Sequence, residues 1–168
     1  SNNSKYDQVL RRERYFTAEE YQGFILMNDQ TKGDCLHCHT TDGDALGTTA
    51  MFSNNGLQKA KSSSDYPDKG KMEITGKPEH LGQFKIPSLR NVAITGPYMH
   101  DGRFATLEEV VDFYSEGVHL SANIDSKMGL AHKGGVHLTE DEKASIVAFL
   151  KTLTDSTFIS NPGFANPF

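Results

Sequence analysis

The chain has 168 residues, the size of one ordinary domain with a single core. Hydrophobic residues make up 36% and charged residues 23%, and no apolar run approaches the roughly 20 residues that cross a bilayer, which excludes a membrane span. The net charge of −5 comes from interleaved acidic and basic residues, with no basic stripe to neutralise a phosphate backbone, so nucleic acid is not an expected partner.

The two ends of the chain are predicted to lie outside the structured domain. The opening residues, SNNSKYDQVL, are polar and lack the charged segment and apolar run of an export signal. We therefore expect that a signal peptide has been removed or that the sequence is an internal piece of a longer chain. We interpret residues 1–16 as a linker or N-terminal extension, residues 17–157 as the domain and residues 158–168 as a C-terminal tail.

A first helix is predicted to begin after Thr17. Thr17 and Glu20 form an S/T-x-x-E capping box, in which each side chain satisfies a free amide of the first turn. The helix is expected to end near Gly33 and to carry the apolar residues Phe24, Ile25 and Met27. Residues 35–39 are expected to form another turn of helix.

Two segments have the composition of loops. Residues 40–56 contain glycine, asparagine and threonine without helical periodicity. Residues 61–80 combine serine, proline, glycine and charge, which favours an exposed irregular segment over a buried element.

Another helix is predicted after Thr106, which forms a capping box with Glu109. Gly117 suits the position just past the end of this helix. Four residues fall at helical spacing and predict its buried face: Leu107, Val110, Val111 and Tyr114.

The last predicted helix has the clearest pattern. Thr139 and Glu142 form a third capping box, and the helix is expected to end near Asp155. One of its faces is lined by Ile146, Val147, Phe149, Leu150 and Leu153. Since no internal repeat or useful strand-like alternation is visible, the sequence predicts a mostly α-helical fold with long loops.

The residues Cys35, Cys38 and His39 form the pattern C-x-x-C-H, which is typical of covalent c-type haem attachment. Two thioethers would hold the porphyrin edge, and the same turn would bring His39 to the iron. These are the only two cysteines of the chain, so one covalent haem would use both. The sequence therefore predicts one haem c.

Other uses of two cysteines are a disulfide, a zinc half-site and a thioredoxin-like redox pair. A structural zinc site usually requires four ligands, and no second C-x-x-C or H-x(3–5)-H module follows, although His37 and His39 could join the cysteines. A thioredoxin-like pair is expected after a strand in a βαβ unit, a pattern that is absent here.

Three stretches resemble the C-terminal haem domain of the bacterial di-haem cytochrome c peroxidase and MauG family. They read RRERYFTAEEYQGFILM, then FKIPSLRNVAITGPYMHDGRFATLEEVVDFYSEGV over residues 84–118, and LTEDEKASIVAFLKTLTD. The most specific element is PSLRN followed by PYMHDG. The resemblance implies a class I cytochrome c-like helical domain wrapped around a covalent haem, with long loops.

The resemblance implies a role in electron transfer. In that family the N-terminal haem meets hydrogen peroxide and the C-terminal haem relays electrons, but this sequence holds only one C-x-x-C-H. We expect a C-terminal piece of a di-haem oxidoreductase that lacks the peroxidatic haem. The competing hypotheses are a free-standing monohaem cytochrome c that carries electrons and a haem sensor with an open distal site.

Three residues are candidates for the sixth iron ligand. Tyr114 occupies the position that supplies the distal methionine in the peroxidases, and it matches the tyrosine-ligated MauG-like branch. Met128 is the second candidate and Met99 the third. A tyrosinate ligand would lower the haem potential and a methionine would raise it; the alternative is that all three side chains are packing residues.

Four further residues are expected near the haem from the resemblance or their chemistry. His100 is expected to hydrogen-bond a propionate, and Arg90 offers a fork of donors that matches a carboxylate. The backbone carbonyls of Thr95 and Pro97 match the family's calcium site, which is expected to be weak or empty without an N-terminal domain.

Covalent haem attachment implies assembly outside the bacterial inner membrane, so we expect an exported, periplasmic protein. The expected partners are a second haem domain of the same or another chain and a small redox protein that donates electrons. The residues do not distinguish a cytochrome donor from a cupredoxin.

Overall fold

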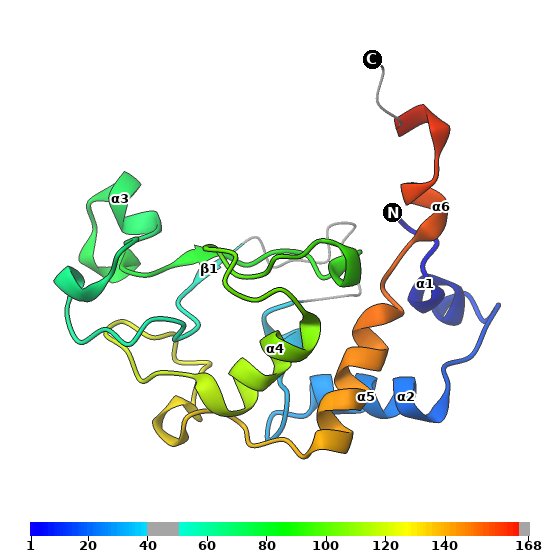
Figure 1. Cartoon of the computed structure of the whole chain (residues 1–168), viewed down its shortest axis with the longest axis horizontal. Coiled ribbons are helices and arrows are strands. Elements are labelled where there is room, and N and C mark those ends of the chain that lie inside the picture. The colour runs from blue at the N-terminus through cyan, green and yellow to red at the C-terminus, as the bar shows by residue number, and fades with distance from the viewer. Residues whose placement is uncertain (40–50, 165–168) are drawn as a thin grey trace.

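The computed structural model describes residues 1–39 and 51–164, and helices and long connecting segments form most of it (Figure 1). The α-helices are α1 (Lys5–Leu10), α2 (Ala18–Asn28), α3 (Lys71–Thr75), α4 (Leu107–Asp112), α5 (Glu140–Lys151) and α6 (Ser156–Ile159). The strands β1 (Phe52–Ser53) and β2 (Phe84–Lys85) pair antiparallel, with Phe52 opposite Lys85. The predicted mostly α-helical fold with long loops is confirmed for these residues.

All three predicted capping boxes are present. The hydroxyl oxygens of Thr17, Thr106 and Thr139 accept bonds of 3.2–3.3 Å from the amides three residues on. In return, the glutamate at each of those positions accepts from the threonine amide. The starts of α2, α4 and α5 are therefore confirmed.

The predicted helix ends were less accurate. Helix α2 ends at Asn28, five residues before Gly33, because the Asp29 carboxylate accepts from the amide and hydroxyl of Thr31 and closes a turn. Helix α5 ends at Lys151, not near Asp155, and Asp155 instead caps α6. At the end of α5, the hydroxyl of the C-cap residue Thr152 donates to the Phe149 carbonyl.

Helix α4 continues directly into a π-helical turn, Phe113–Gly117. Gly117, predicted to lie just past the end of this helix, is instead the last residue of the π turn, and its φ is not positive. The wider turn changes the direction of the side chains that follow Asp112. Tyr114, a candidate iron ligand, lies on it.

The loop prediction for residues 61–80 was partly wrong, because this segment contains α3 and two 3-10 turns, Ser63–Asp65 and Pro78–His80. Tyr66 is also buried, and its hydroxyl donates to the Ala122 carbonyl at 2.6 Å. Of the predicted loop 40–56, residues 40–50 lie outside the described residues, and β1 interrupts the rest.

The main core forms where α2 packs on α5 (Figure 1). At the contact, a Cβ added to Gly23 would overlap the Ser145 carbonyl oxygen, so the two backbones approach as closely as glycine allows. Around this point Phe149 is fully buried, with its ring centroid 5.4–5.9 Å from those of Tyr6, Phe16 and Phe24. Edge-on and tilted contacts of this kind suit aromatic rings.

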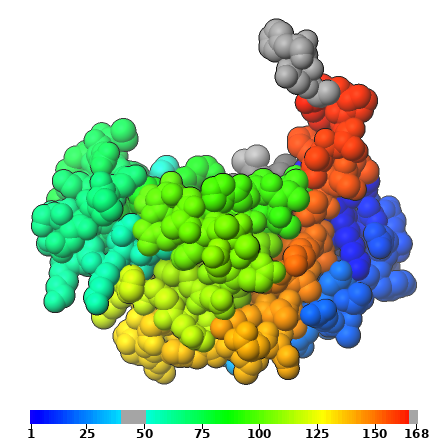
Figure 2. All heavy atoms as spheres, viewed as in Figure 1, coloured from blue at the N-terminus to red at the C-terminus, as the bar shows by residue number. Residues whose placement is uncertain are grey.

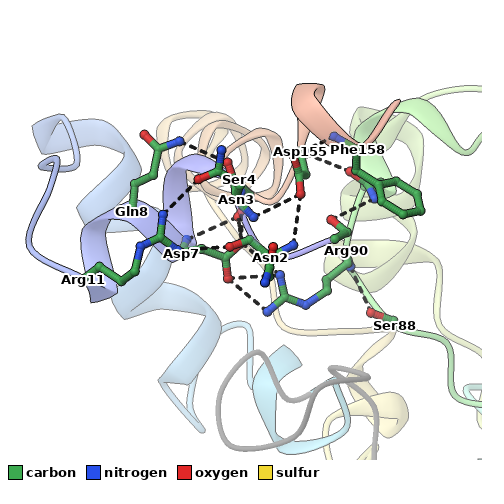
Figure 3. A network of polar contacts seen from close by, with 12 residues as sticks. Asn2, Asn3, Ser4, Asp7, Gln8, Arg11, Ser88, Arg90, Asp155 and Phe158 are labelled. Atoms are coloured by element: carbon green, nitrogen blue, oxygen red, sulfur yellow. Dashed lines mark hydrogen bonds and ion pairs between the residues drawn. The ribbon is translucent and has the colours of Figure 1, made fainter. Parts of the chain in front are cut away.

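The N-terminal segment is folded onto the domain. Ser4 caps α1, and Tyr6 and Asp7 are buried. Arg90 donates to both Asp7 carboxylate oxygens at 3.0–3.1 Å (Figure 3). Residues 1–16 are thus an ordered extension, whereas the domain boundaries at 16 and 157 remain predictions.

Asp155 ties the two ends of the chain together (Figure 3). One carboxylate oxygen accepts from the amides of Asn2 and Asn3 at 3.0 Å, and the other from the Thr157 hydroxyl and the Phe158 amide. Burial alone would raise the pKa of Asp155, but these donors outweigh it and hold the pKa well below its usual range. The buried carboxylate is therefore charged in the folded protein.

Beyond Asp155 the chain leaves the body of the molecule, and the residues of α6 and the turn Pro162–Phe164 project from it (Figure 2). The rings of Phe158 and Phe164 lie 5.0 Å apart in this tail and are exposed. Within the described residues, no helix has the length and apolar character that a bilayer span requires.

The close contact at Gly23 predicts that replacing this helical glycine by alanine destabilises the protein, which is the opposite of the usual effect. In a helix interior, alanine is normally about 1 kcal/mol more stabilising than glycine. We expect Gly23→Ala to lower the free energy of unfolding by about 1–3 kcal/mol instead, because the added methyl group forces α2 and α5 apart. Denaturant unfolding would measure this, with Gly129→Ala as control because no atom lies within 4 Å of its added Cβ. A gain in stability for Gly23→Ala would contradict the close contact.

The Asp155 network predicts a dependence of stability on pH. Since the folded-state pKa of Asp155 is depressed, its contribution is complete above the unfolded pKa of about 4 and is lost as pH falls through the folded pKa. Asp155→Ala is expected to lower the free energy of unfolding by about 1–3 kcal/mol at neutral pH. The difference from wild type should shrink in acid. Exposed Asp141, outside this network, supplies the control variant, and a pH-independent difference would count against the mechanism.

Candidate functional site

The C-x-x-C-H residues form the turn that the sequence predicts. Cys35–His37 is a 3-10 turn, and the His39 amide donates to the Cys35 carbonyl at 2.8 Å, which places both cysteines and His39 within one tight loop. Asp34 precedes the turn in the left-handed conformation, with φ +46°. Both thiols are free and half-buried.

Burial raises the pKa of the Cys35 thiol to about 12 and also raises that of Cys38. Both groups are therefore neutral thiols at neutral pH. A redox dithiol or zinc-binding pair is favoured by surroundings that stabilise the thiolate. In residues 1–39 and 51–164, moreover, no three or more His, Cys, Asp or Glu side chains are grouped to hold a metal ion. The local environment does not favour the zinc and redox alternatives.

His39 is oriented by a distant part of the chain. Its Nδ1 lies 2.9 Å from the carbonyl oxygen of Pro87, so Nδ1–H donates and Nε2 keeps its lone pair. Burial lowers the pKa of His39 despite this bond, which keeps the imidazole neutral at neutral pH. A neutral histidine whose second nitrogen donates to a carbonyl is the usual form of a metal ligand.

All three candidate distal ligands belong to one apolar cluster, which we call the distal cluster. Its buried members are Leu57, Phe113, Val118 and Ala131, and Met99, Phe104, Tyr114, Ile124 and Met128 pack against them. The structure therefore brings Tyr114, Met99 and Met128 together. It does not by itself choose among them.

Tyr114 is the candidate with the clearest relation to the haem motif. Burial raises the pKa of its phenol to about 12, Asn55 opposes this by donating to the phenol oxygen at 3.0 Å, and Cys35 and Cys38 raise it further. The two cysteines of the C-x-x-C-H turn therefore act electrostatically on the Tyr114 phenol. Burial raises the pKa of Cys38, and of the two residues just before Met128, Lys127 lowers that pKa and Asp125 raises it.

The π turn that carries Tyr114 is held from outside. The Tyr114 carbonyl accepts from the Val136 amide at 3.2 Å, and the Ser115 carbonyl accepts from His137 at 3.0 Å. A Cβ on Gly135 would overlap both carbonyl oxygens, so only glycine permits this approach. π turns are frequent at functional sites, and this one was not predicted. The Gly134-Gly135 pair was the signal that could have indicated a close backbone contact.

The structure gives less direct support to the other residues that the sequence analysis expects near the haem. The Nη1 and Nη2 atoms of Arg90 bind Asp7, but its buried Nε has no hydrogen-bond partner among the described residues. His100 is exposed, and its ring stacks on Phe84 with centroids 3.6 Å apart. Thr95 and Pro97 are also exposed. The propionate contacts and the calcium site remain predictions.

The arrangement fits a covalently attached haem. Two neutral thiols on one turn and a neutral histidine whose Nδ1 donates to a carbonyl are groups that can attach such a cofactor and bind its iron, and the distal cluster adds a half-buried phenol and two thioethers that could serve as a second ligand. Sequence reasoning identified most of these residues. It missed Asn55 and Gly135, because neither belongs to a motif.

The chain is similar in sequence to MauG proteins and cytochrome c peroxidases of bacteria. It is 33% identical to methylamine utilization protein MauG of Paracoccus denitrificans, over 92% of this chain and 47% of that protein. It is also 33% identical to cytochrome c551 peroxidase of Nitrosomonas europaea, over 90% of this chain and 39% of the relative. No family model matches the chain.

Solved structures agree with these relatives. A MauG-like protein associated with microbial copper homeostasis superposes with a TM-score of 0.82 and 36% identity, over 99% of this chain and 52% of that one. The diheme peroxidase BthA of Burkholderia thailandensis gives a TM-score of 0.69 at 22% identity, over 93% of this chain and 47% of that one, which shows the fold alone.

The chain spans about half, or less, of the length of the relatives it matches. The resemblance to the bacterial di-haem cytochrome c peroxidase and MauG family is confirmed, and these relatives support haem c as the cofactor.

Proposed function

We propose, from this confirmed resemblance, that the chain is a haem c electron-transfer domain of a di-haem peroxidase or MauG-like oxidoreductase and relays electrons to a second haem. The observation that carries the proposal is the C-x-x-C-H turn, with His39 held by Pro87, together with the half-buried Tyr114 of the distal cluster, on whose phenol the two cysteines act electrostatically. One haem is expected on this chain.

Haem c, when bound, supplies a one-electron iron couple. Cys35 and Cys38 would hold it through thioethers, and His39 Nε2 would bind the iron on one face. The Pro87 carbonyl fixes the histidine tautomer and makes Nε2 a stronger donor. The distal cluster would shield a bound haem from water, which would further tune the iron potential.

Tyr114 is proposed as the ligand on that opposite face. Its buried phenol is neutral without a metal, so binding to iron would require loss of the phenol proton. A tyrosinate would stabilise ferric iron and lower the potential. Such a site suits an oxidoreductase that reaches high oxidation states better than a high-potential carrier.

The partners follow from the same proposal. The part of the relatives that this chain does not match leaves room for a second haem domain, in the same polypeptide or another. A small redox protein would donate electrons at an exposed haem edge. Because haem c is attached outside the bacterial inner membrane, we propose that the protein is exported to the periplasm.

A free-standing monohaem cytochrome c is the second candidate. Its support is that Met99 and Met128 pack on the same distal cluster as Tyr114, so a thioether ligand is available. Methionine would raise the potential and produce an ordinary electron carrier. The two candidates therefore differ in the chemistry of one iron bond.

The attachment residues can be tested directly. Cys35→Ala and Cys38→Ala are each expected to leave haem held by one thioether at most, and the double variant to lose covalent haem completely. The measurement is the pyridine haemochrome spectrum, whose main band shifts with each missing thioether, together with haem staining of the denatured protein. Covalent haem in the double variant would contradict the proposed attachment.

The distal ligand can be tested by Tyr114→Phe. The ferric absorption and electron paramagnetic resonance spectra should change, and the midpoint potential should rise, because a ligand that favours ferric iron is lost. Tyr21→Phe is the matched control, since Tyr21 is exposed on α2. An unchanged Tyr114→Phe spectrum, with loss of a far-red methionine–iron band in Met128→Leu or Met99→Leu, would favour the electron carrier.

A further inference from the structure

Asn55 contacts two of the three candidate distal ligands at once. Its side-chain nitrogen lies 3.0 Å from the Tyr114 phenol oxygen and 3.6 Å from the Met99 sulfur. An amide nitrogen has two hydrogens and can serve both acceptors. Because a thioether has no hydrogen to donate, the nitrogen end of the amide, and not its oxygen, suits this position.

The backbone around Asn55 is firmly held. The neighbouring Asn54 is buried, and its amide nitrogen donates to the Tyr66 hydroxyl at 2.8 Å and to the Ala122 carbonyl at 3.2 Å. On the other side, the carbonyl of Gly56 accepts from the His119 amide at 2.9 Å. Gly56 has φ +75°, and an added Cβ would lie 2.7 Å from the His119 carbonyl oxygen. The amide of Asn55 is therefore presented from a fixed segment.

Met99 occupies a strained position beside it. Its φ of +71° lies in the left-handed region, which is unfavourable for a residue with a side chain. Such a conformation persists only where the surroundings determine it. Two contacts do so here: the bond of 2.7 Å from the Tyr98 amide to the Phe104 carbonyl, and the contact of the Met99 sulfur with Asn55.

We propose that Asn55 is a positioning residue that selects tyrosine over methionine as the sixth ligand. One amide hydrogen holds the Tyr114 oxygen and the other keeps the Met99 thioether on Asn55. The inference rests on the proposed function, because it assumes that haem lies between His39 and the distal cluster.

The proposal predicts a change of ligand when the amide is removed. Asn55→Leu has a similar volume but no donor, so Tyr114 loses its hydrogen bond and Met99 is released. The ferric spectrum of the haem-loaded protein is expected to lose its tyrosinate features and to gain a far-red methionine–iron band. That band should disappear again in the double variant Asn55→Leu/Met99→Leu.

The experiment compares absorption and electron paramagnetic resonance spectra of the ferric wild type, Asn55→Leu and the double variant. Asn28→Leu is the control, because Asn28 lies exposed on α2 and its amide donates only to the Phe24 carbonyl in the described residues. Its spectra should match wild type. If Asn55→Leu does not fold, as judged by circular dichroism, Asn55→Ala takes its place under the same criteria.

An Asn55→Leu spectrum identical to wild type would overturn the inference. So would a change that Met99→Leu does not reverse, because the amide would then not select between the two ligands. Tyr114→Phe tests the tyrosine ligation separately from the role of Asn55. If Tyr114→Phe alters the spectrum and Asn55→Leu does not, only the role of Asn55 is wrong; if Tyr114→Phe has no effect, the proposed tyrosine ligation itself fails.

Discussion

The close contact of α2 and α5 at Gly23 is the constraint on which the site depends. Helix α2 leads directly into the C-x-x-C-H turn, and the Gly33 amide bonds back to the Leu26 carbonyl to set where that turn begins. At the start of α5, the Leu138 amide donates to the Ser115 hydroxyl, next to Tyr114 on the π turn. The C-x-x-C-H turn and the π turn of Tyr114 are thus each tied by hydrogen bonds to segments that adjoin these two helices.

Burial determines the chemistry of the groups that meet there. It raises the pKa of Cys35 and of Tyr114 to about 12 and lowers that of His39, so all three side chains are neutral at neutral pH. Neutral thiols, a neutral imidazole and a protonated phenol bring no charge of their own, which suits an apolar macrocycle. Asp155, a buried charge, lies at the joined termini and is stabilised by four donors.

Local patterns predicted helix starts better than helix ends. Each start depended on a threonine and a glutamate three residues apart, and all three pairs form the expected bonds. The ends depended on Asp29 and Thr152, whose side chains make local hydrogen bonds that the apolar periodicity does not reveal. The loop prediction for residues 61–80 was partly wrong for a similar reason, since Tyr66 is buried by a distant carbonyl, that of Ala122.

By itself, the sequence determined the attachment turn, the mostly helical fold and the family resemblance, because these depend on residues a few positions apart. Only the tertiary structure decided that Pro87 orients His39, that Arg90 binds Asp7, and that Asn55 lies between Tyr114 and Met99. Each of these contacts joins residues more than forty positions apart. Their partners are chosen by the packing of the helices and by the positive-φ turns that direct the loops between them, and no short motif encodes that geometry.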